Sequence, residues 1–329
     1  MKYLDNKITD PYYNLALEEW IFKNKYDDDY FMLWQNDRSI IIGRNQNTIE
    51  EINQAFVEDE SIKVVRRMPG GGAVYHDLGN VNFSFFTNAD DDFEINFKKI
   101  AKLVTKSLKN MGIDAYLSGR NDILINDKKI SGLSQRSNDK RTLTNGAILF
   151  DVNLDMLTNA LRVKEDKFRS KGVKSVRSRV NNIKNELDYD MEINEFIKNL
   201  KSQIISTYPS YEEISLSKEE NQQIINLRNS KYITYEWNYG QSLPSNLCNY
   251  KYFPNKGLLE VRAILNNGLI EDIKLYGDFF SSLDIRDFEK LLIGKKYKPD
   301  EIKSVVNTID LRAYLGHITI DDLIDVMFA

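Results

Sequence analysis

Two arginines followed by three glycines form the stretch of this chain best suited to binding an anion. Arg66 and Arg67 follow a short apolar run and precede Gly70–Gly72, and an alternating, strand-like pattern then covers residues 81–86. Glycines weaken a strand, so folds keep them where a ligand or another backbone must come close. Guanidinium groups pair well with carboxylates and phosphates. A tight turn with two solvated arginines would explain a lone glycine run, so other motifs must decide.

A lysine near a predicted strand end is the second feature. Asn121 precedes and Asp122 begins a predicted strand over 122–125, and a turn leads to a second strand that contains Lys129 and Ser131. In a strand with a period of two, Lys129 and Ser131 share a face. A fixed cation there would stabilise charge that develops on a phosphate, and Asn121 with Asp122 could orient Mg²⁺ or a ribose. Taken alone, a lysine that protects a hairpin edge is the simpler interpretation.

A basic segment is the third feature. Six basic residues and no acidic residue lie between positions 167 and 179, in a segment that includes Lys171, Gly172, Ser175 and Arg177. Such a run is usually a solvated face. In an acidic protein it could also be a loop that closes over a phosphate-bearing ligand. The residues alone leave both interpretations open.

Composition limits the function classes. The chain has 329 residues and a net charge of −4, which suits two domains and gives no support for binding nucleic acid or an anionic membrane. One cysteine, Cys248, excludes an internal disulfide framework, and two histidines, His76 and His317, leave little room for a histidine metal cluster. No signal peptide and no membrane-length apolar run are recognisable, so we expect a cytoplasmic protein. Neither a P-loop nor a G-x-G-x-x-G pattern occurs, so a site for ATP would need a different phosphate-binding motif.

The hydrophobic pattern predicts strands and helices mixed along most of the chain. It predicts a helix over 14–22, a hairpin of strands 31–34 and 39–43, and a helix over 50–59. Further helices are expected over 94–111, 154–161, 192–206 and 218–229, and further strands over 81–86, 122–125, 128–135 and 143–150. The fold class is therefore α+β, with a mixed sheet flanked by helices.

A polar stretch with two prolines follows the tetrapeptide 237–240 and suggests a domain boundary. We expect a large domain over 1–243 and a small α+β accessory domain over 244–329, which opens on a hairpin.

Taken together, these motifs resemble the lipoate–protein ligase family in their order and spacing. The matching residues are Asp10, Pro11, Asn14–Ala16, Glu18, Glu19, Gly43, Arg44, Gln46, Asn47, Arg66, Arg67, Gly70–Asp77, Gly79, Asn80, Gly119–Asp122, Lys129, Ser131, Gly132, Lys171, Gly172, Ser175–Arg179 and Trp237–Gly240. The resemblance implies the fold of the biotin and lipoyl ligases. It also implies a two-step reaction, in which lipoate and ATP give lipoyl-adenylate and pyrophosphate, and the acyl group then passes to a lysine on a carrier.

By this resemblance, the cofactors are ATP and Mg²⁺, and lipoate is the substrate. The partner would be an apo lipoyl domain of a 2-oxoacid dehydrogenase E2 subunit or a glycine cleavage H-type protein, and the ligase would act as a monomer in lipoate salvage.

The resemblance also implies a role for each matching residue. Lys129 would be catalytic and would hold the acyl carbonyl and the α-phosphate. The acyl chain and lipoyl-adenylate would contact Trp34, Arg67, Gly71, Gly72 and Lys129, in an apolar slot supplied by the strands that carry Trp34 and Phe83. The nucleotide would contact Tyr75, His76, Asn80, Asn121, Asp122, Lys171, Gly172, Ser175 and Arg177, and Asp122 would bind Mg²⁺.

The chain departs from the family pattern near this region. Pro69 stands where Ser or Thr is usual, Leu133 replaces a small polar residue, and Asn145-Gly146-Ala147 replaces His-Gly-Thr. We therefore expect a divergent paralogue with an altered acyl substrate or a dedicated carrier.

Three other functions remain open at this stage. An octanoyl or lipoyl transferase without ATP would need a thiolate, for which Cys248 is the only candidate. A non-catalytic module that binds lipoyl domains would need no phosphate site. A biotin ligase shares the fold, but its Arg- and Gly-rich biotin loop is missing.

Overall fold

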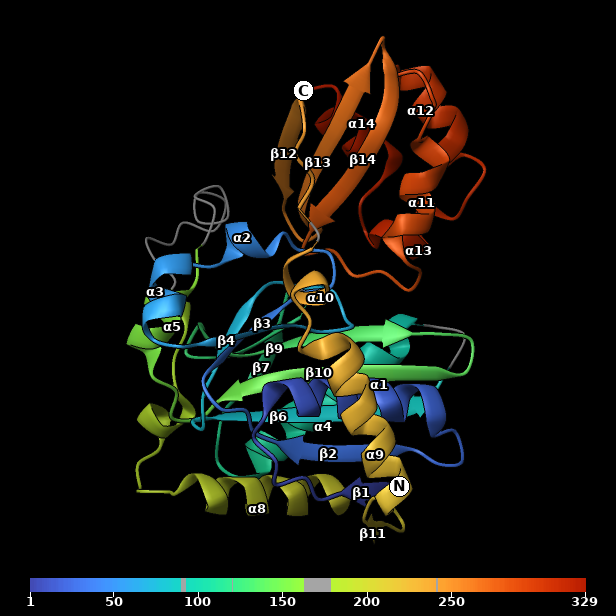
Figure 1. Cartoon of the computed structure of the whole chain (residues 1–329). Helices are drawn as coiled ribbons and strands as arrows, with labels where there is room; N and C mark the ends of the chain where they lie inside the picture. Colours follow the sequence, from blue (N-terminus) through green and yellow to red (C-terminus); the bar gives the residue numbers. More distant parts are fainter. Residues whose placement is uncertain (90–92, 120, 163–178, 241) are drawn as a thin grey trace.

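The computed structural model describes residues 1–89, 93–119, 121–162, 179–240 and 242–329. An eight-stranded mixed sheet forms the centre of the larger part, in the order β11-β1-β2-β6-β10-β9-β8-β7 (Figure 1). β1 runs parallel to β11 and β2, and the other neighbouring pairs are antiparallel. The strands span Lys2–Leu4 (β1), Tyr30–Trp34 (β2), Asn80–Asn88 (β6), Tyr116–Ser118 (β7), Asp122–Ile125 (β8), Lys128–Ser137 (β9), Arg141–Leu149 (β10) and Glu212–Ile214 (β11).

Helices cover both faces of this sheet. On one face, α4 and α8 pack Val104 and Phe196 into a core with Phe85 of the sheet. On the other face, Leu17 of α1 packs in a second core with Met32 of β2, and α9 lies beside α1. The predicted mixed sheet flanked by helices is confirmed. These helices span Pro11–Asn24 (α1), Phe93–Asn110 (α4), Ile193–Ile205 (α8) and Lys218–Leu227 (α9).

Local sequence explains where several elements begin and turn. The carboxylate of Asp10 accepts a hydrogen bond from the backbone N–H of Tyr12, and Pro11 occupies the first turn of α1, where no N–H is needed. The hairpin of β8 and β9 turns at Asn126 and Asp127, whose φ angles are 48° and 60°. Asn and Asp tolerate this left-handed conformation, and the predicted hairpin is confirmed.

A three-stranded sheet in the order β4-β3-β5 stands apart from the large sheet. Its β3 pairs with β4 in parallel and with β5 antiparallel. The predicted hairpin of strands 31–34 and 39–43 is therefore wrong, because β2 pairs with β1 and β6 in the large sheet instead. These strands span Ser39–Ile42 (β3), Lys63–Arg66 (β4) and Val74–His76 (β5).

The helix predicted over 50–59 is broken. Buried Ile52 forms an isolated bridge with Leu161, and the backbone N–H of Asn53 donates to the carbonyl of Ala160. This long-range pairing replaces the helical hydrogen bonds at that point. The remaining helical elements of the larger part are Thr48–Glu51 (α2), Gln54–Asp59 (α3), Leu154–Ala160 (α5), the 3₁₀ helix Ile183–Glu186 (η1), the π-helix Arg228–Tyr232 (η2) and Tyr235–Tyr239 (α10).

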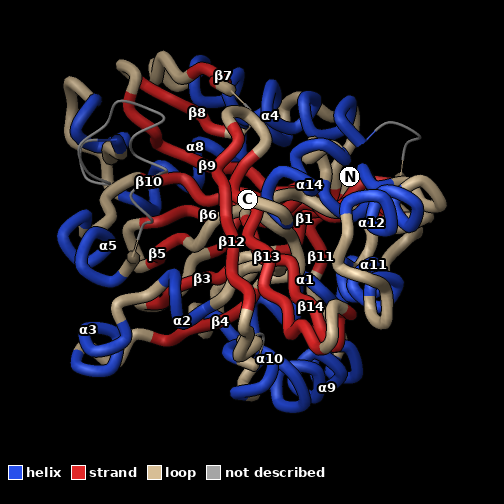
Figure 2. Tube along the Cα trace, turned by 90° about the horizontal axis from the view of Figure 1, so that it is seen from above, coloured by secondary structure: helices blue, strands red, loops and turns tan. Residues whose placement is uncertain are grey.

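The C-terminal part has a sheet and a core of its own. Its antiparallel strands lie in the order β12-β13-β14, and Figure 2 shows α11 and α12 beside them. Buried side chains of the sheet and its helices form one separate cluster. The expected hairpin is confirmed as β13 and β14, whereas β12 was not predicted. The elements span Leu247–Phe253 (β12), Gly257–Asn266 (β13), Leu269–Gly277 (β14), Ile285–Leu292 (α11), Pro299–Val306 (α12), Leu311–Leu315 (α13) and Ile320–Met327 (α14).

None of the helices in the described ranges combines the length and apolar character that crossing a bilayer requires.

Candidate active site

A pocket of about 120 Å³ lies between the large sheet and the small one. Its floor includes most of a row of residues that pair side by side across five strands of the large sheet. The row runs from Asp122 on β8 through Gly132, Ala147 and Asn82 to Trp34 on β2, and all of these except Asp122 line the pocket. Residues paired in this way point to the same face of a sheet. The row therefore links the predicted catalytic strand to the predicted apolar slot.

Lys129 lies across the charged end of this row. Its Nζ is 2.7 Å from Oδ1 of Asp122, and the second oxygen of Asp122 is 2.8 Å from Nη2 of Arg179. A Cβ atom on Gly132 would stand 2.8 Å from Nζ of Lys129, so the lysine passes directly over this glycine. The absence of a side chain at Gly132 is what gives Lys129 its path.

The strand register does not follow the simple alternation expected at Lys129. Ile123 pairs with Ser131 and Leu124 pairs with Lys129, so Ile130 is an extra residue in β9. Lys129 lines the pocket, whereas Ser131 is buried and is not among the lining residues. A bulge of this kind turns side chains away from the regular period of two.

The glycine turn forms the roof of the pocket, and Arg67 holds it in place. Nη2 of Arg67 donates to the carbonyls of Gly70 and Gly72, at 2.7 and 2.8 Å, and Nη1 donates to the carbonyl of Ile41 at 3.1 Å. Gly71 has a φ of 91°, which strongly favours glycine. Nε of Arg67 has no hydrogen-bond partner among the described residues, and Arg67, Gly71 and Gly72 all line the pocket.

Arg66 has a different role from its neighbour. Its fully buried guanidinium donates to the carbonyls of Gly43, Gln46 and Trp237 and to the hydroxyl of Thr48, at 2.7 to 3.0 Å. Burial lowers the pKa of Arg66 to about 9. Arg66 therefore ties the loop after β3 to α10, and it is not among the residues that line the pocket.

A buried carboxylate lies beside the row, which the sequence did not identify as part of the site. Glu18 of α1 accepts hydrogen bonds from Ser84 at 2.6 Å and from Asn145 at 2.9 and 3.2 Å. Ser84 in turn accepts from the indole N–H of Trp34, and the amide oxygen of Asn145 accepts from Ser134. Burial raises the pKa of Glu18, and the hydrogen bonds from Ser84 and Asn145 act in the opposite direction. A carboxylate within the apolar face of helix 14–22 was the available signal.

His76 reaches the pocket as a neutral side chain. Burial lowers its pKa to about 3, and the positive charge of Arg67 adds to this effect. Nδ1 of His76 is 3.1 Å from the amide nitrogen of Asn36, whose amide oxygen accepts from Asn14. Nδ1 is therefore an acceptor and the proton of the neutral ring belongs on Nε2. Nε2 has no partner among the described residues, so His76 can offer a hydrogen bond to a ligand.

The other predicted residues fall into three groups. Trp34, Asn121 and Lys129 line the pocket. Tyr75 and Asn80 are buried and are not among the lining residues: Tyr75 packs in the core of the small sheet, and the amide oxygen of Asn80 accepts from the backbone N–H of Asp77. The basic-segment residues lie outside the described residues. They are Lys171, Gly172, Ser175 and Arg177.

The positions that depart from the family pattern are close to the pocket. Leu133, Asn145, Gly146 and Ala147 line it, whereas Pro69 does not, and its carbonyl accepts from the backbone N–H of Arg44 at 3.0 Å. The strand that carries Phe83 contributes Asn82 rather than the phenyl ring, because Phe83 points into the core on the opposite face.

The C-terminal part contacts the roof of the pocket directly. Nη2 of Arg44 is 2.8 Å from Oδ2 of Asp284, and the backbone N–H of Gly277 donates to the carbonyl of Asn45 at 2.9 Å. A Cβ atom on Gly71 would stand 3.1 Å from the ring of Phe280. The glycine turn is thus held between Arg67 and the accessory domain.

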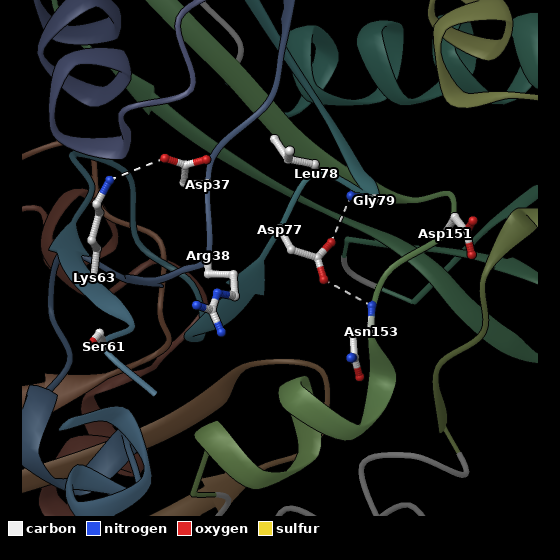
Figure 3. A pocket seen from close by; sticks show the side chains of 9 residues that line it. All are labelled: Asp37, Arg38, Ser61, Lys63, Asp77, Leu78, Gly79, Asp151 and Asn153. Atoms are coloured by element: carbon white, nitrogen blue, oxygen red, sulfur yellow. Dashed lines mark hydrogen bonds and ion pairs between the residues drawn. The ribbon is translucent and has the colours of Figure 1, made fainter. Parts of the chain in front are cut away.

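A larger open hollow of about 600 Å³ contains none of the predicted site residues (Figure 3). The carboxylate of Asp77 faces it, but its oxygens accept from the backbone N–H groups of Gly79 and Asn153, at 2.8 and 3.0 Å. Lys63 lies 3.4 Å from Asp37 in the same hollow. These charges are used within the protein, so size alone does not make this hollow the active site.

Comparison with known proteins identifies two family domains in the chain. The lipoyl protein ligase A/B catalytic domain matches residues 10–205, and the bacterial lipoate protein ligase C-terminus matches residues 243–327. The chain is 43% identical to the lipoate-protein ligase LplJ of Bacillus subtilis, over 100% of both chains. It is 41% identical to lipoate–protein ligase 1 of Staphylococcus aureus, over 99% of this chain and 100% of the relative.

Solved structures agree with this assignment. P. falciparum LipL1 in complex with lipoate has a TM-score of 0.78 at 25% identity, covering 94% of this chain and 95% of that one. A lipoate-protein ligase A bound with ATP has a TM-score of 0.65 at 30% identity, covering 73% and 98%. A bi-partite lipoate protein ligase of Thermoplasma acidophilum, described with its E2 lipoyl domain, has a TM-score of 0.66 at 32% identity, covering 75% and 98%.

Proposed function

This chain belongs to the lipoate–protein ligase family and is an ATP-dependent lipoate–protein ligase, and we propose that the pocket between its two sheets performs both steps of the reaction. The identity of 43% over the full length of LplJ gives no support to a divergent paralogue. The assignment also favours an ATP-dependent ligase over a transferase that uses Cys248, which lies on β12 of the accessory domain.

The row across the large sheet is the observation that carries this proposal. Neighbouring strands are about 4.8 Å apart, so Gly132 and Asn82, two strands from each other, are separated by roughly 10 Å. An extended octanoyl-length chain, whose C–C bonds are about 1.5 Å each, reaches nearly as far. A carboxyl group at Lys129 would therefore place the tail over Ala147 and toward Asn82 and Trp34.

In the first step, an oxygen of the lipoate carboxylate bonds to the α-phosphorus of ATP. The bond between the α-phosphorus and its bridging oxygen breaks, and pyrophosphate leaves with that electron pair. Lys129 lies at the charged end of the row and would stabilise the negative charge that develops at the phosphate. Arg67 and His76 line the same pocket, and each has a donor without a partner among the described residues, Nε and Nε2. They would bind oxygen atoms of the adenylate.

In the second step, the ε-amine of a carrier lysine bonds to the acyl carbon and AMP leaves with the electron pair of the C–O bond. The amine must lose a proton during this step. His76 is neutral but carries its proton on Nε2 and presents no free acceptor to the pocket. We therefore assign His76 to binding and not to general-base catalysis.

Asn121 and Asp122 are the residues that would hold Mg²⁺ in this proposal. The amide nitrogen of Asn121 donates to the carbonyl of Leu133, which leaves its amide oxygen for a cation. Within the described ranges no three His, Cys, Asp or Glu side chains form a metal cluster, and Mg²⁺ commonly uses one or two carboxylates together with phosphate oxygens. Asp122 and Asn121 would hold the ion, which would neutralise phosphate charge when bound, and Asp122 would then exchange its ion pairs with Lys129 and Arg179 for the metal.

Several further points belong to the same proposal. Tyr75 and Asn80 would act by shaping the backbone beside the nucleotide, and Lys171, Gly172, Ser175 and Arg177 would cover the adenylate.

The acceptor would be an apo lipoyl domain of an E2 subunit or a glycine cleavage H-type protein, and the E2 lipoyl domain studied with the T. acidophilum ligase supports this class. We place the domain boundary at residues 243 and 244, and we propose a cytoplasmic monomer.

Intact-mass analysis of an apo E2 lipoyl domain and an apo H-type protein tests this function. Incubation with the ligase, lipoate, ATP and Mg²⁺ should add one lipoyl group to the carrier lysine, and no group should be added without ATP. Labelling from synthetic lipoyl-adenylate but not from lipoate and ATP would contradict the first step. Labelling of neither carrier under any condition would contradict the acceptor class.

A further inference from the structure

The side chain of Asn82 is unusual among the polar groups of the floor. It is 1% exposed, lines the pocket, and makes no side-chain hydrogen bond to any described residue. A buried carboxamide normally has partners, because an unmade hydrogen bond costs about 1 to 3 kcal/mol. Asn82 thus has hydrogen-bonding capacity that none of the described residues uses.

Two neighbouring polar side chains on the same face, Asn145 and Ser84, are fully engaged; the amide nitrogen of Asn80 on β6 also lacks a partner among the described residues, but Asn80 does not line the pocket. Asn145 uses both ends of its amide, with Glu18 and Ser134, and Ser84 binds Glu18 and Trp34. Ser84 is two residues from Asn82 on β6 and shares its face. The hydrogen bonds of Ser84 and Asn145 are therefore all made within the protein, whereas the side chain of Asn82 is left to bind a ligand in the pocket.

The position of Asn82 in the floor matches the far end of the acyl chain. Asn82 stands between Ala147 and Trp34 in the row, two strands from Gly132, over which Lys129 passes. With the carboxyl group at Lys129, the middle of the chain would lie over Ala147, which presents only a methyl group. The tail would then meet the carboxamide of Asn82 beside the indole of Trp34.

We propose that Asn82 is a specificity-determining residue, which donates a hydrogen bond to a sulfur atom of the tail and so favours a dithiolane acid over a plain alkyl acid of the same length. This inference rests on the proposed function, because it takes Lys129 as the site of the carboxyl group. Sulfur is a weak acceptor, but an alkyl tail would displace water from Asn82 and offer no acceptor at all. Sites built to hydrogen-bond a substrate discriminate against analogues that lack the partner.

Two other unpartnered donors line the pocket, but they belong to a different part of it. Nε of Arg67 and Nε2 of His76 come from the small sheet and the glycine turn, and we have assigned them to adenylate oxygens. Asn82 is on the large sheet, in the row with Trp34. Its effect should therefore appear in the choice of tail and not in the use of ATP.

The test compares Asn82→Thr with Asn82→Val, two variants of nearly the same shape that differ in a hydroxyl donor. For each variant and the wild type, kcat/KM for pyrophosphate exchange is measured with lipoate and with octanoate. We expect the wild type to prefer lipoate, Asn82→Val to lose roughly five- to tenfold of that preference, and Asn82→Thr to keep part of it. The KM for ATP should be unchanged in both variants.

The outcomes separate this inference from the function on which it rests. Wild-type exchange with neither acid would overturn the proposed function itself. Wild-type exchange with an unchanged lipoate-to-octanoate ratio in Asn82→Val would overturn the role of Asn82. Equal losses in Asn82→Thr and Asn82→Val would also overturn it, because shape and not donation would then set the preference. Thermal unfolding of each variant shows whether the fold is retained.

Discussion

The floor and the roof of the pocket are held in place by different means. On the floor, the pairing register of the strands aligns Asp122, Gly132 and Asn82. The roof is a glycine turn without a regular ladder, and the side chain of Arg67 and contacts from the accessory domain position it. A register cannot change without moving a whole strand, so substitutions on the floor should alter the rate of the reaction more than the stability of the fold. Substitutions among the residues that support the roof should instead lower the free energy of unfolding.

The largest effect on stability is expected for Arg66→Lys. Lysine offers a compact ammonium in place of the planar fork that reaches several carbonyls. Buried acceptors would be left unmatched, and we expect a loss of about 3 to 5 kcal/mol in the free energy of unfolding. Urea denaturation measures it. A loss below about 1 kcal/mol would show that the link between the loop after β3 and α10 does not depend on this arginine.

Gly132→Ala should separate chemistry from stability on the floor. The new Cβ would stand 2.8 Å from Nζ and 3.0 Å from Cε of Lys129, and the flexible lysine would have to move. We expect adenylate formation to fall roughly ten- to hundredfold, with unfolding free energy changed by less than about 1 kcal/mol. Single-turnover formation of lipoyl-adenylate and urea denaturation measure the two effects. Equal activity in the variant would mean that the reaction does not require the Lys129 side chain to lie over Gly132.

The neutral state of His76 makes the roof sensitive to acid. The pKa of His76 is about 3 in the folded protein and near 6.5 in the unfolded chain. Between these two pH values, only the unfolded chain binds a proton at His76. Stability from this group is therefore present above pH 6.5 and falls as the pH is lowered, by up to about 1.4 kcal/mol per pH unit. His76→Gln should reduce the slope of unfolding free energy between pH 6 and pH 4. The exposed His317→Gln variant is the matched control, and an unchanged slope in His76→Gln would refute this account.

The smallest effect is expected for Asp284→Asn, which removes the charge that faces Arg44. Asparagine still caps α11, where Asp284 accepts from the backbone N–H of Arg286. The variant keeps the cap but weakens two ion pairs of Asp284, with Arg44 and with Arg286, and we expect a loss of at most about 1 kcal/mol that decreases as salt is added. Thermal unfolding at low and high salt measures it. A larger loss, or one independent of salt, would mean that Asp284 supports the roof in some other way.

Local signals in the sequence predicted the parts of this structure that depend on near neighbours. The turn at Asn126 and Asp127 defined the hairpin that carries Lys129, and apolar spacing predicted the helix over 14–22, although α1 begins earlier, at Pro11. The resemblance to the lipoate–protein ligases then supplied the pocket residues Trp34 and Arg67.

Features that depend on distant pairing were not predicted. The strands β2 and β3 are close in sequence and look like a hairpin, but each finds its partners elsewhere in the chain. The bulge at Ile130 depends on how β8 pairs with β9. The place of Asn82 in the floor depends on three strands at once, so no local pattern could show that its carboxamide faces the tail of the substrate.

The account rests most heavily on Lys129 as the cation at the charged end of the row. Lipoate-dependent exchange of labelled pyrophosphate into ATP tests this directly, in the wild type, in Lys129→Ala and in Lys128→Ala, which alters an exposed neighbour. We expect exchange in the wild type and in Lys128→Ala, and a loss of at least about 10²- to 10³-fold in Lys129→Ala. Exchange in Lys129→Ala within tenfold of the wild type would contradict the account.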